Sequence, residues 1–489
     1  MKMKKSYILG ANKSQWENES VDQSLMPSCF IASRLANYIT KTSFGDIPIE
    51  VVESAKVNIM DSISCMIGGL FTPNGKIVTE ALLQEGDNLE SSILGLERKT
   101  YALQASLINS ILANALDYDD YYPLSHPNAT IVPPGLAVSE AYKINGKAFL
   151  TAVVVANEVY LRIMRSLLPS KKQQEEIFGF GAHQTFGAAI VSGKLINLNE
   201  KQMAYAIGIA GANAPISSCA KTVWGDTPTM VKNNYGLASY VGVLASKLAK
   251  YGFTGPLDIF EGKTGFWKMS GSDQFKPEEI TRDLGINYLI KEIQFKPYPC
   301  CRWLHSSLDA ILKLKRKYNF EIGDIEKIEV KTHSLTTVYP FTNSKPKTLE
   351  EAIFSFKYLA AVVISGIPLG QKWYDKETLN NLKILALAEK VEILEDEEVN
   401  SCYPDKLLSK VSIYISNGKC LSTRVDYPKG TVENPIKKYD IEKKFKQLTQ
   451  EVFTDEKVKQ ILAVIWKLEQ LDDINKLTSL FHPTRVSQL

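Results

Sequence analysis

Apolar residues recur every three to four positions over the first part of the chain, from about residue 28 to 290. This spacing is typical of amphipathic and buried helices. We expect another helix to begin at Asp46-Ile47-Pro48, with Asp46 as its cap and Pro48 in its first turn. The spacing predicts helices at 105–116, 136–143, 149–167, 185–195 and 235–250.

The pattern changes after about residue 290. Apolar and charged residues alternate over 328–332, which predicts a half-buried strand. The same alternation occurs at 411–415 and 421–425, on either side of Asn417-Gly418. Asn-Gly between two alternating runs is the strongest short signal for a β-hairpin. Helical spacing returns between residues 441 and 481.

These patterns predict a mainly α protein with about two domains, as a length of 489 residues also suggests. Residues 1–24 are polar and are expected to be flexible. Residues 25–290 and 431–489 are expected to form one large, discontinuous helical domain. A smaller α+β lid domain is expected over residues 291–430.

Composition narrows the classes of function. A formal net charge of +3 gives no strong attraction to nucleic acid or membrane surfaces, so a small anionic substrate would have to be recognised locally. The longest apolar run, 149–156, is too short to span a bilayer. Seven scattered cysteines without a CxxC pair favour reduced thiols in a cytoplasm-like compartment.

Several common chemistries leave no trace in the sequence. It contains no phosphate-binding P-loop, no GxGxxG dinucleotide motif and no GxSxG motif of serine hydrolases. No two of its five histidines lie at a metal-ligand spacing such as i, i+4, and its seven cysteines contain no CxxC pair. We therefore expect neither a nucleotide cofactor nor a metal.

An acidic segment at the end of an apolar helix is the strongest candidate for chemistry. Asp117, Asp119 and Asp120 follow the helix closely, although the negative end of a helix dipole disfavours acids. His126 comes nine residues after Asp117, in a loop stiffened by prolines. The segment is either an acid–base site or a solvated acidic loop followed by a structural histidine.

Other candidate residues lie further along the chain. His183 precedes an apolar helix, where it would either help to hold an anion or simply cap the helix. Lys232 is either a partly buried site residue or a solvated charge. Lys296 begins a segment that contains Cys300, Cys301, Arg302 and His305 at the expected domain junction, where small-molecule clefts often lie.

Taken together, these segments resemble the MmgE/PrpD family, which includes 2-methylcitrate dehydratases and cis-aconitate decarboxylases. The similarity extends over about residues 28–481, and its Cys-Cys pattern is closer to fungal decarboxylases. It implies the two-domain architecture described above, a homodimer, and no metal or organic cofactor. It is carried by Asp46-Ile-Pro, Ala115-Leu-Asp-Tyr-Asp-Asp, His126-Pro, Ile131-Val-Pro-Pro, Gly181-Ala-His183, Met230-Val-Lys232, Phe295-Lys296, Cys300-Cys301, His305, Phe354-Ser-Phe-Lys-Tyr358, Tyr427-Pro-Lys-Gly430 and Asn434-Pro435.

The resemblance also assigns roles. It implies that His126 handles protons and that Lys296 binds a substrate carboxylate, and we expect Asp117 to orient His126. Tyr121 and Cys301 stand where animal cis-aconitate decarboxylases have threonine and histidine. The residues expected to be catalytic are His126, Asp117, His183 and Lys232. The residues expected to bind substrate are Lys296, Tyr121, Cys301, His305 and Tyr339.

The resulting hypothesis is a cofactor-independent lyase that acts on a di- or tricarboxylic acid, most simply a cis-aconitate decarboxylase that forms itaconate. A dehydratase of 2-methylcitrate or citrate type would use the same residues. The substitutions at Tyr121 and Cys301 leave open an isomerase or cyclase that acts on a larger substrate. A non-enzymatic binding protein is the remaining alternative, and the joint presence of acid, base and lysine candidates disfavours it.

Overall fold

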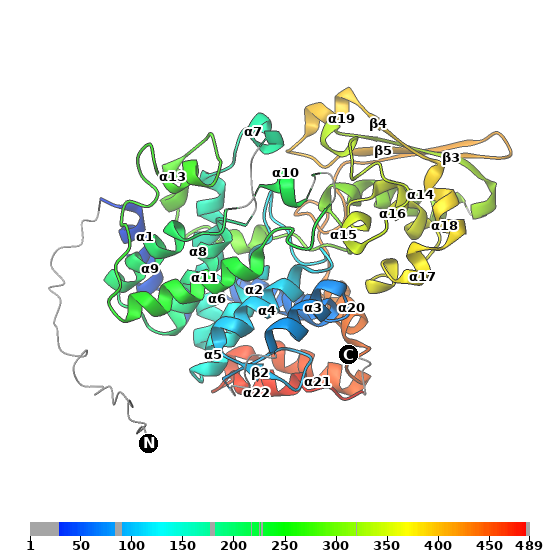
Figure 1. Ribbon diagram of the computed structural model, residues 1–489. Helices are drawn as coiled ribbons and strands as arrows, with labels where there is room; N and C mark the ends of the chain where they lie inside the picture. Colours follow the sequence, from blue (N-terminus) through cyan, green and yellow to red (C-terminus); the bar gives the residue numbers. More distant parts are fainter. Residues whose placement is uncertain are drawn as a thin grey trace, which may run out of the picture.

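The computed structural model describes residues 29–83, 90–176, 181–216, 218–223, 225, 228–318 and 320–485. The expected flexible segment, residues 1–24, lies outside these ranges. Figure 1 shows a large helical body, with a small sheet and its own helices on one side of it. The mainly α fold predicted from the sequence is therefore confirmed.

The helical body is built from both ends of the chain. Its first part contains α1 (Ile31–Lys41), α2 (Ile49–Gly69), α3 (Pro73–Leu83), α4 (Ala102–Asn114), α5 (Val132–Ala141), α6 (Gly146–Ser166), α7 (Lys171–Glu176), α8 (Gln184–Leu195), α9 (Glu200–Ala212), α10 (Cys219–Thr222), α11 (Tyr235–Lys250), α12 (Phe266–Met269) and α13 (Pro277–Thr281). A short hairpin of β1 (Ser91–Ser92) and β2 (Lys99–Thr100) is also part of it. Its last part contains α20 (Lys438–Thr449), α21 (Asp455–Ile465) and α22 (Asn475–Thr478).

The predicted helices are confirmed with boundaries shifted by a few residues, and α11 matches its prediction at both ends. The expected cap of α2 is wrong. Pro48 occupies the N-cap position, and Asp46 instead ends a preceding 3-10 turn. The carboxylate of Asp46 accepts hydrogen bonds from the backbone N–H and the hydroxyl of Ser43, at 2.8 and 2.7 Å.

The lid contains one four-stranded sheet in the order β4-β3-β5-β6. Its strands are β3 (Ile325–Thr332), β4 (Val391–Glu395), β5 (Ser409–Ile415) and β6 (Cys420–Val425). Strands β5 and β6 form the predicted hairpin, in which Gly418 adopts a φ of 77° that the tight turn requires. The surrounding helices are α14 (His305–Tyr318), α15 (Leu349–Ala352), α16 (Phe356–Ile364), α17 (Lys376–Leu379), α18 (Leu382–Glu389) and α19 (Glu397–Cys402).

Two hydrophobic cores support these two regions. The first includes residues from α2, α6 and α8, and also Phe445, Ile461 and Phe481 from the C-terminal segment. The second is centred on the lid, but it also contains Leu116 and Tyr118 from the loop after α4. That loop therefore packs at the junction of the two cores. The exact domain boundaries remain a prediction, which this division of the cores supports.

In the described part of the chain, no helix is both long enough and apolar enough to cross a membrane.

Candidate active site

The loop after α4 contains the acidic segment, and its backbone is unusual. Asp117 has a φ of 50° and Leu124 a φ of 58°, and both line one pocket. Lys232, which also lines this pocket, has a φ of 41°. Left-handed backbone at a residue other than glycine costs about 1–3 kcal/mol and clusters at functional sites. The strain is thus concentrated where these segments meet.

Asp117 is the centre of a buried charge cluster. Its Oδ1 lies 2.7 Å from Lys232 Nζ and its Oδ2 lies 3.0 Å from Lys296 Nζ. Lys296 Nζ also donates to the backbone carbonyl of Asp117, at 2.8 Å. Burial alone would raise the pKa of Asp117, but the two ammonium groups and His126 outweigh it and hold this pKa well below its usual value. Asp117 is therefore an anion at neutral pH.

His126 has a different carboxylate as its nearest partner. Its Nδ1 lies 3.2 Å from Asp119 Oδ2, whereas its Nε2 lies 3.9 Å from Asp117 Oδ1. The expectation that Asp117 orients His126 therefore needs correction, since the oxygens of Asp117 are occupied by the two lysines. Nδ1 lies within ion-pair distance of Asp119 but without the geometry of a hydrogen bond, so the contact between them is electrostatic. The ring of Tyr121 lies edge-on to the imidazole, with centroids 6.1 Å apart.

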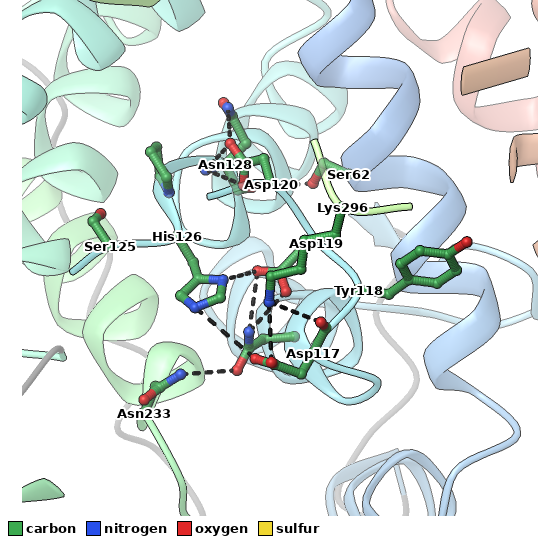
Figure 2. A network of polar contacts seen from close by, with 12 residues as sticks. Ser62, Asp117, Tyr118, Asp119, Asp120, Ser125, His126, Asn128, Asn233 and Lys296 are labelled. Atoms are coloured by element: carbon green, nitrogen blue, oxygen red, sulfur yellow. Dashed lines mark hydrogen bonds and ion pairs between the residues drawn. The ribbon is translucent and has the colours of Figure 1, made fainter. Parts of the chain in front are cut away.

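The end of α4 connects these groups, as Figure 2 shows in part. The side-chain amide of Asn114 donates to Asp119 Oδ1 at 2.9 Å, and its carbonyl accepts from Asn233 Nδ2 at 3.3 Å. The backbone carbonyl of Asn114 accepts from Lys232 Nζ at 3.2 Å. One residue thus fixes the lysine segment and the partner of the histidine at once.

The third acid of the segment faces elsewhere. Asp120 accepts a 2.6 Å hydrogen bond from Asn128 Nδ2, and burial raises its pKa well above the usual value. Asp117, Asp119 and Asp120 are only 3, 1 and 2% exposed. The alternative of a solvated acidic loop is therefore wrong. Lys232, at 6% exposed, is likewise not a solvated charge.

A pocket adjoins this cluster. Its residues come from the loop after α4, from the segment before α11, and from the segment that enters the lid. The pocket therefore lies at the junction of the two cores. It is lined by Asp117, Tyr121, Leu124, Ser125, His126, Val223, Lys232, Asn233, Lys296, Cys301, Arg302, Trp303 and Phe354.

Six of the nine predicted site residues line this pocket, and three do not. His305 is fully buried and contacts Arg302, which does line the pocket. His183 is 2% exposed and stacks on Tyr160, with centroids 5.6 Å apart, and burial lowers its pKa to about 3. Tyr339 is 38% exposed in the lid and is absent from the lining. Substrate roles for these three remain predictions without direct pocket contact.

The acidic residues and the histidine also meet one geometric requirement for a metal site. In the described ranges, ligand atoms of Asp117, Asp119 and His126 lie within 4.8 Å of one another. However, both oxygens of Asp117 are already ion-paired with lysine ammonium groups, which would repel a divalent cation. The donor set therefore fits a metal poorly, and independence of metal remains a prediction.

Comparison with known proteins agrees with this architecture. Residues 33–278 match the MmgE/PrpD N-terminal domain and residues 298–470 match the MmgE/PrpD C-terminal domain. The chain belongs to the MmgE/PrpD family. The family resemblance drawn from the sequence is thus confirmed, and the two matched regions meet beside the pocket.

Individual MmgE/PrpD relatives extend over almost the whole chain. A cis-aconitate decarboxylase-like protein, oryM, of Aspergillus oryzae is 25% identical over 93% of this chain and 98% of its own length. Cis-aconitate decarboxylase of Aspergillus terreus is 26% identical, over 92% and 96% respectively. Cis-aconitate decarboxylase of Mus musculus is 25% identical, over 88% and 89%.

Sequence reasoning missed several polar groups of this MmgE/PrpD site, and Asp119 and Arg302 are the charged ones. Asp119 was one acid among three, and only the fold reveals that it is the nearest carboxylate to His126. Arg302 belonged to the segment at the predicted junction, but it was not assigned to a site. Its position next to Cys301, in a segment already rich in polar groups, was the available signal.

Proposed function

We propose that this protein is a lyase that acts on a di- or tricarboxylic acid, with cis-aconitate as the first substrate to test and itaconate as the product. The observation that carries the proposal is the buried cluster of Asp117, Lys232 and Lys296 beneath a pocket that His126 also lines. The names of the relatives support the same reaction class.

Lys232 and Lys296 would provide the electrostatic part of the reaction. Both lysines pair with the single carboxylate of Asp117. The two ammonium groups therefore carry one positive charge that Asp117 does not neutralise. In a largely buried site, this surplus would attract a substrate carboxylate more strongly than in water. Lys296 is fully buried and held by two bonds to Asp117, so its position needs little reorganisation on binding.

His126 would move the proton. In decarboxylation, the bond to one carboxylate carbon breaks, CO2 leaves, and the electron pair remains as an allylic carbanion. His126 Nε2–H would then protonate that carbanion, while Asp119 stabilises the imidazolium before transfer. The products are CO2 and the protonated, rearranged alkene, and solvent returns the proton to the histidine.

Dehydration by the same residues is the second candidate. The pocket has an apolar side that includes Leu124, Val223 and Phe354, which would suit a substrate with an additional methyl group. For 2-methylcitrate, a base would take the proton beside a carboxylate and an acid would assist the departure of hydroxide. An isomerase or cyclase that acts on a larger substrate would also use this apolar side.

Proton NMR of the purified protein with cis-aconitate, citrate and 2-methylcitrate tests these candidates. We expect the vinyl signals of itaconate to grow with cis-aconitate. Formation of aconitate or methylaconitate would instead establish the dehydratase. Absence of turnover with all three acids would refute the proposal and favour the isomerase, the cyclase or a binding protein.

The assembly and requirements of the enzyme complete the proposal. We expect a homodimer, an intracellular and cytoplasmic location, and activity that survives dialysis against a chelator. Size-exclusion chromatography with light scattering tests the first, and the NMR assay after dialysis tests the last. A monomer, or activity restored only by a divalent metal, would contradict these parts.

A further inference from the structure

Arg302 is a buried cation without a carboxylate partner. It is 2% exposed, and no Asp or Glu oxygen in the described ranges lies within 4.0 Å of its guanidinium. Burial lowers its pKa to about 10, so it is still charged at neutral pH. Buried charges in proteins are normally paired, because an isolated one is costly to desolvate. The missing anion therefore needs an explanation.

The protein uses only part of the hydrogen-bonding capacity of Arg302. One terminal nitrogen, Nη1, donates to His305 Nδ1 at 3.0 Å and to the carbonyl of Lys429 at 2.9 Å. The other, Nη2, donates to Gln294 Oε1 at 3.3 Å. Nε is buried and makes no hydrogen bond to any described residue. Of its five N–H donors, the Nε–H and one hydrogen of Nη2 therefore remain without a hydrogen bond to the protein.

Asp309 is the carboxylate that acts on Arg302 electrostatically, but its oxygens are hydrogen-bonded to other groups. Asp309 accepts from Tyr298 Oη at 2.6 Å and from the backbone N–H of Lys429 at 2.7 Å. Arg302 lines the pocket described above, on the side that enters the lid. A carboxylate is the anion that guanidinium N–H donors most often bind in proteins.

His305 fixes the guanidinium from behind. Its Nε2 lies 3.2 Å from the carbonyl of Cys300, which can only accept, so this nitrogen carries the hydrogen. Its Nδ1 is thereby free to accept from Arg302. Burial, together with the nearby charges of Arg302 and Lys296, keeps the pKa of His305 well below its usual value. A neutral imidazole is therefore held in the tautomer that orients the arginine.

We infer that Arg302 is a specificity-determining anchor for a second carboxylate of the substrate, and that His305 is the positioning residue that aims it. This inference rests on the proposed function for its substrate class. It divides the pocket into a lysine side at Asp117 and an arginine side at the lid. A substrate with two separated carboxylates would bridge the two sides, whereas a monocarboxylate would fill only one.

Calorimetric titration with acids of different charge tests the anchor. The probes are cis-aconitate, itaconate and crotonate, which carry three, two and one carboxylates. Loss of charge-assisted hydrogen bonds of about 1.5–3 kcal/mol predicts that Arg302→Gln weakens cis-aconitate binding by roughly 10- to 150-fold. Crotonate binding should change less than about threefold. Arg316→Gln, an exposed arginine on α14, is the matched control and should leave all three affinities unchanged.

The outcomes separate the anchor from the proposed function. Equal weakening of all three acids in Arg302→Gln, or no weakening, would overturn the anchor. Binding of cis-aconitate without turnover, still lost in Arg302→Gln, would refute the proposed reaction and keep the anchor. Wild-type protein that binds none of the three acids would overturn both.

Steady-state kinetics with paired variants test the role of His305. His305→Phe removes the acceptor and should raise KM as Arg302→Gln does, with a smaller change in kcat. His305→Asn keeps an acceptor near the position of Nδ1 and should restore most of the loss. The double variant should have the KM of Arg302→Gln alone, because His305 acts through Arg302. Additive increases in KM in the double variant would overturn the positioning role. Equal losses of activity in both single variants, accompanied by a matching decrease in Tm, would also overturn it.

Discussion

Two buried lysine–aspartate clusters lie close together in the fold of this protein, but they differ in their surroundings. Asp117 faces Lys232 and Lys296 at 2.7 and 3.0 Å, and all three line the pocket. Asp61 faces Lys444 at 2.6 Å, between α2 and α20, and neither residue lines it. The first cluster meets the pocket, whereas the second joins the C-terminal segment to the helical body.

Electrostatics and backbone separate the clusters further. Burial raises the pKa of Asp61 because the single ammonium of Lys444 does not outweigh it, whereas two ammonium groups lower the pKa of Asp117. Asp61 lies in the regular middle of α2, but Asp117 has a strained, left-handed backbone. If the proposed function holds, the same residue types serve stability where the backbone is relaxed, and chemistry where a strained backbone and two lysines meet a pocket.

The largest expected effect is at the pocket. His126→Ala should lower turnover by roughly 10²- to 10⁴-fold, the usual contribution of general acid–base catalysis. The side chain is only 12% exposed and lies beside the buried Asp119, so its removal should also lower the melting temperature, and turnover is therefore expressed per folded molecule. NMR turnover and thermal melts of the same preparation measure both. Near-normal turnover would contradict the distinction between the two clusters, because the Asp117 cluster would then have no proton-transferring residue beside it.

The next effect belongs to the structural cluster. Asp61→Asn leaves Lys444 as a buried, unpaired charge, which should cost about 3–5 kcal/mol of unfolding free energy. Turnover per folded molecule should change far less than in His126→Ala, because the pair does not line the pocket. Urea unfolding and active-site-normalised kinetics provide the two values.

A matched double variant controls for the charge itself. Asp61→Leu combined with Lys444→Met removes both charges, and it should recover much of the stability lost in Asp61→Asn. If the double variant is no more stable than Asp61→Asn, the loss comes from packing and not from an unpaired ammonium. A selective loss of turnover in stable protein would instead assign this pair to the site.

Helices and strands with a regular pattern of apolar residues were predictable from the sequence. The pairing of elements that lie far apart in the sequence was not. The hairpin at Asn417-Gly418 and the helix α11 follow from local pattern alone. Strand β4 was missed, because its five residues contain three apolar side chains between acids and its pairing with β3 is parallel and distant. Parallel pairing leaves no turn signal in the sequence.

The same limit applied to the candidate site. The acidic segment and His126 were predictable because charges at a helix end are unfavourable without partners. Which acid faces the imidazole was not, since left-handed backbone at Asp117 turns its carboxylate toward the lysines and leaves Asp119 for the histidine. Arg302 needed the fold, because only burial without a carboxylate distinguishes it from other arginines.

A smaller effect is expected from His183, in the dependence of stability on pH. It tests whether this histidine serves stability, as Asp61 and Lys444 do, or belongs to the pocket. Its pKa of about 3 in the folded protein lies below the ordinary value of 6.5. The unfolded chain therefore binds more protons between these values, and stability is complete above pH 6.5 and falls as the pH decreases. His183 should contribute up to about 1.4 kcal/mol per pH unit to this slope, and His305, whose pKa is also lowered, adds to it.

His183→Phe should flatten that slope while keeping an aromatic ring against Tyr160. Urea unfolding at pH 7, 6, 5 and 4 measures it, and His482→Phe, at an exposed histidine, is the control. An unchanged slope would show that His183 is not buried in the neutral form. A large loss of turnover at pH 7, with unchanged stability, would move His183 into the site.

The smallest expected effect concerns Cys301, which lines the pocket beside Arg302. Burial, with the nearby charge of Asp117, raises the pKa of Cys301 to about 12, so the thiol is protonated at pH 8. Because the thiolate is the reactive form, iodoacetamide should modify the exposed Cys29 and Cys420 first and leave turnover intact. Cys301→Ala should accordingly change kcat by less than about threefold, since a neutral thiol contributes contact but no charge. Peptide mapping alongside activity decides this point. The contrary outcome is rapid modification of Cys301 that abolishes turnover and that bound substrate prevents. It would show a reactive thiol in the pocket. The site would then combine thiol chemistry with the acid–base chemistry that the charge cluster implies.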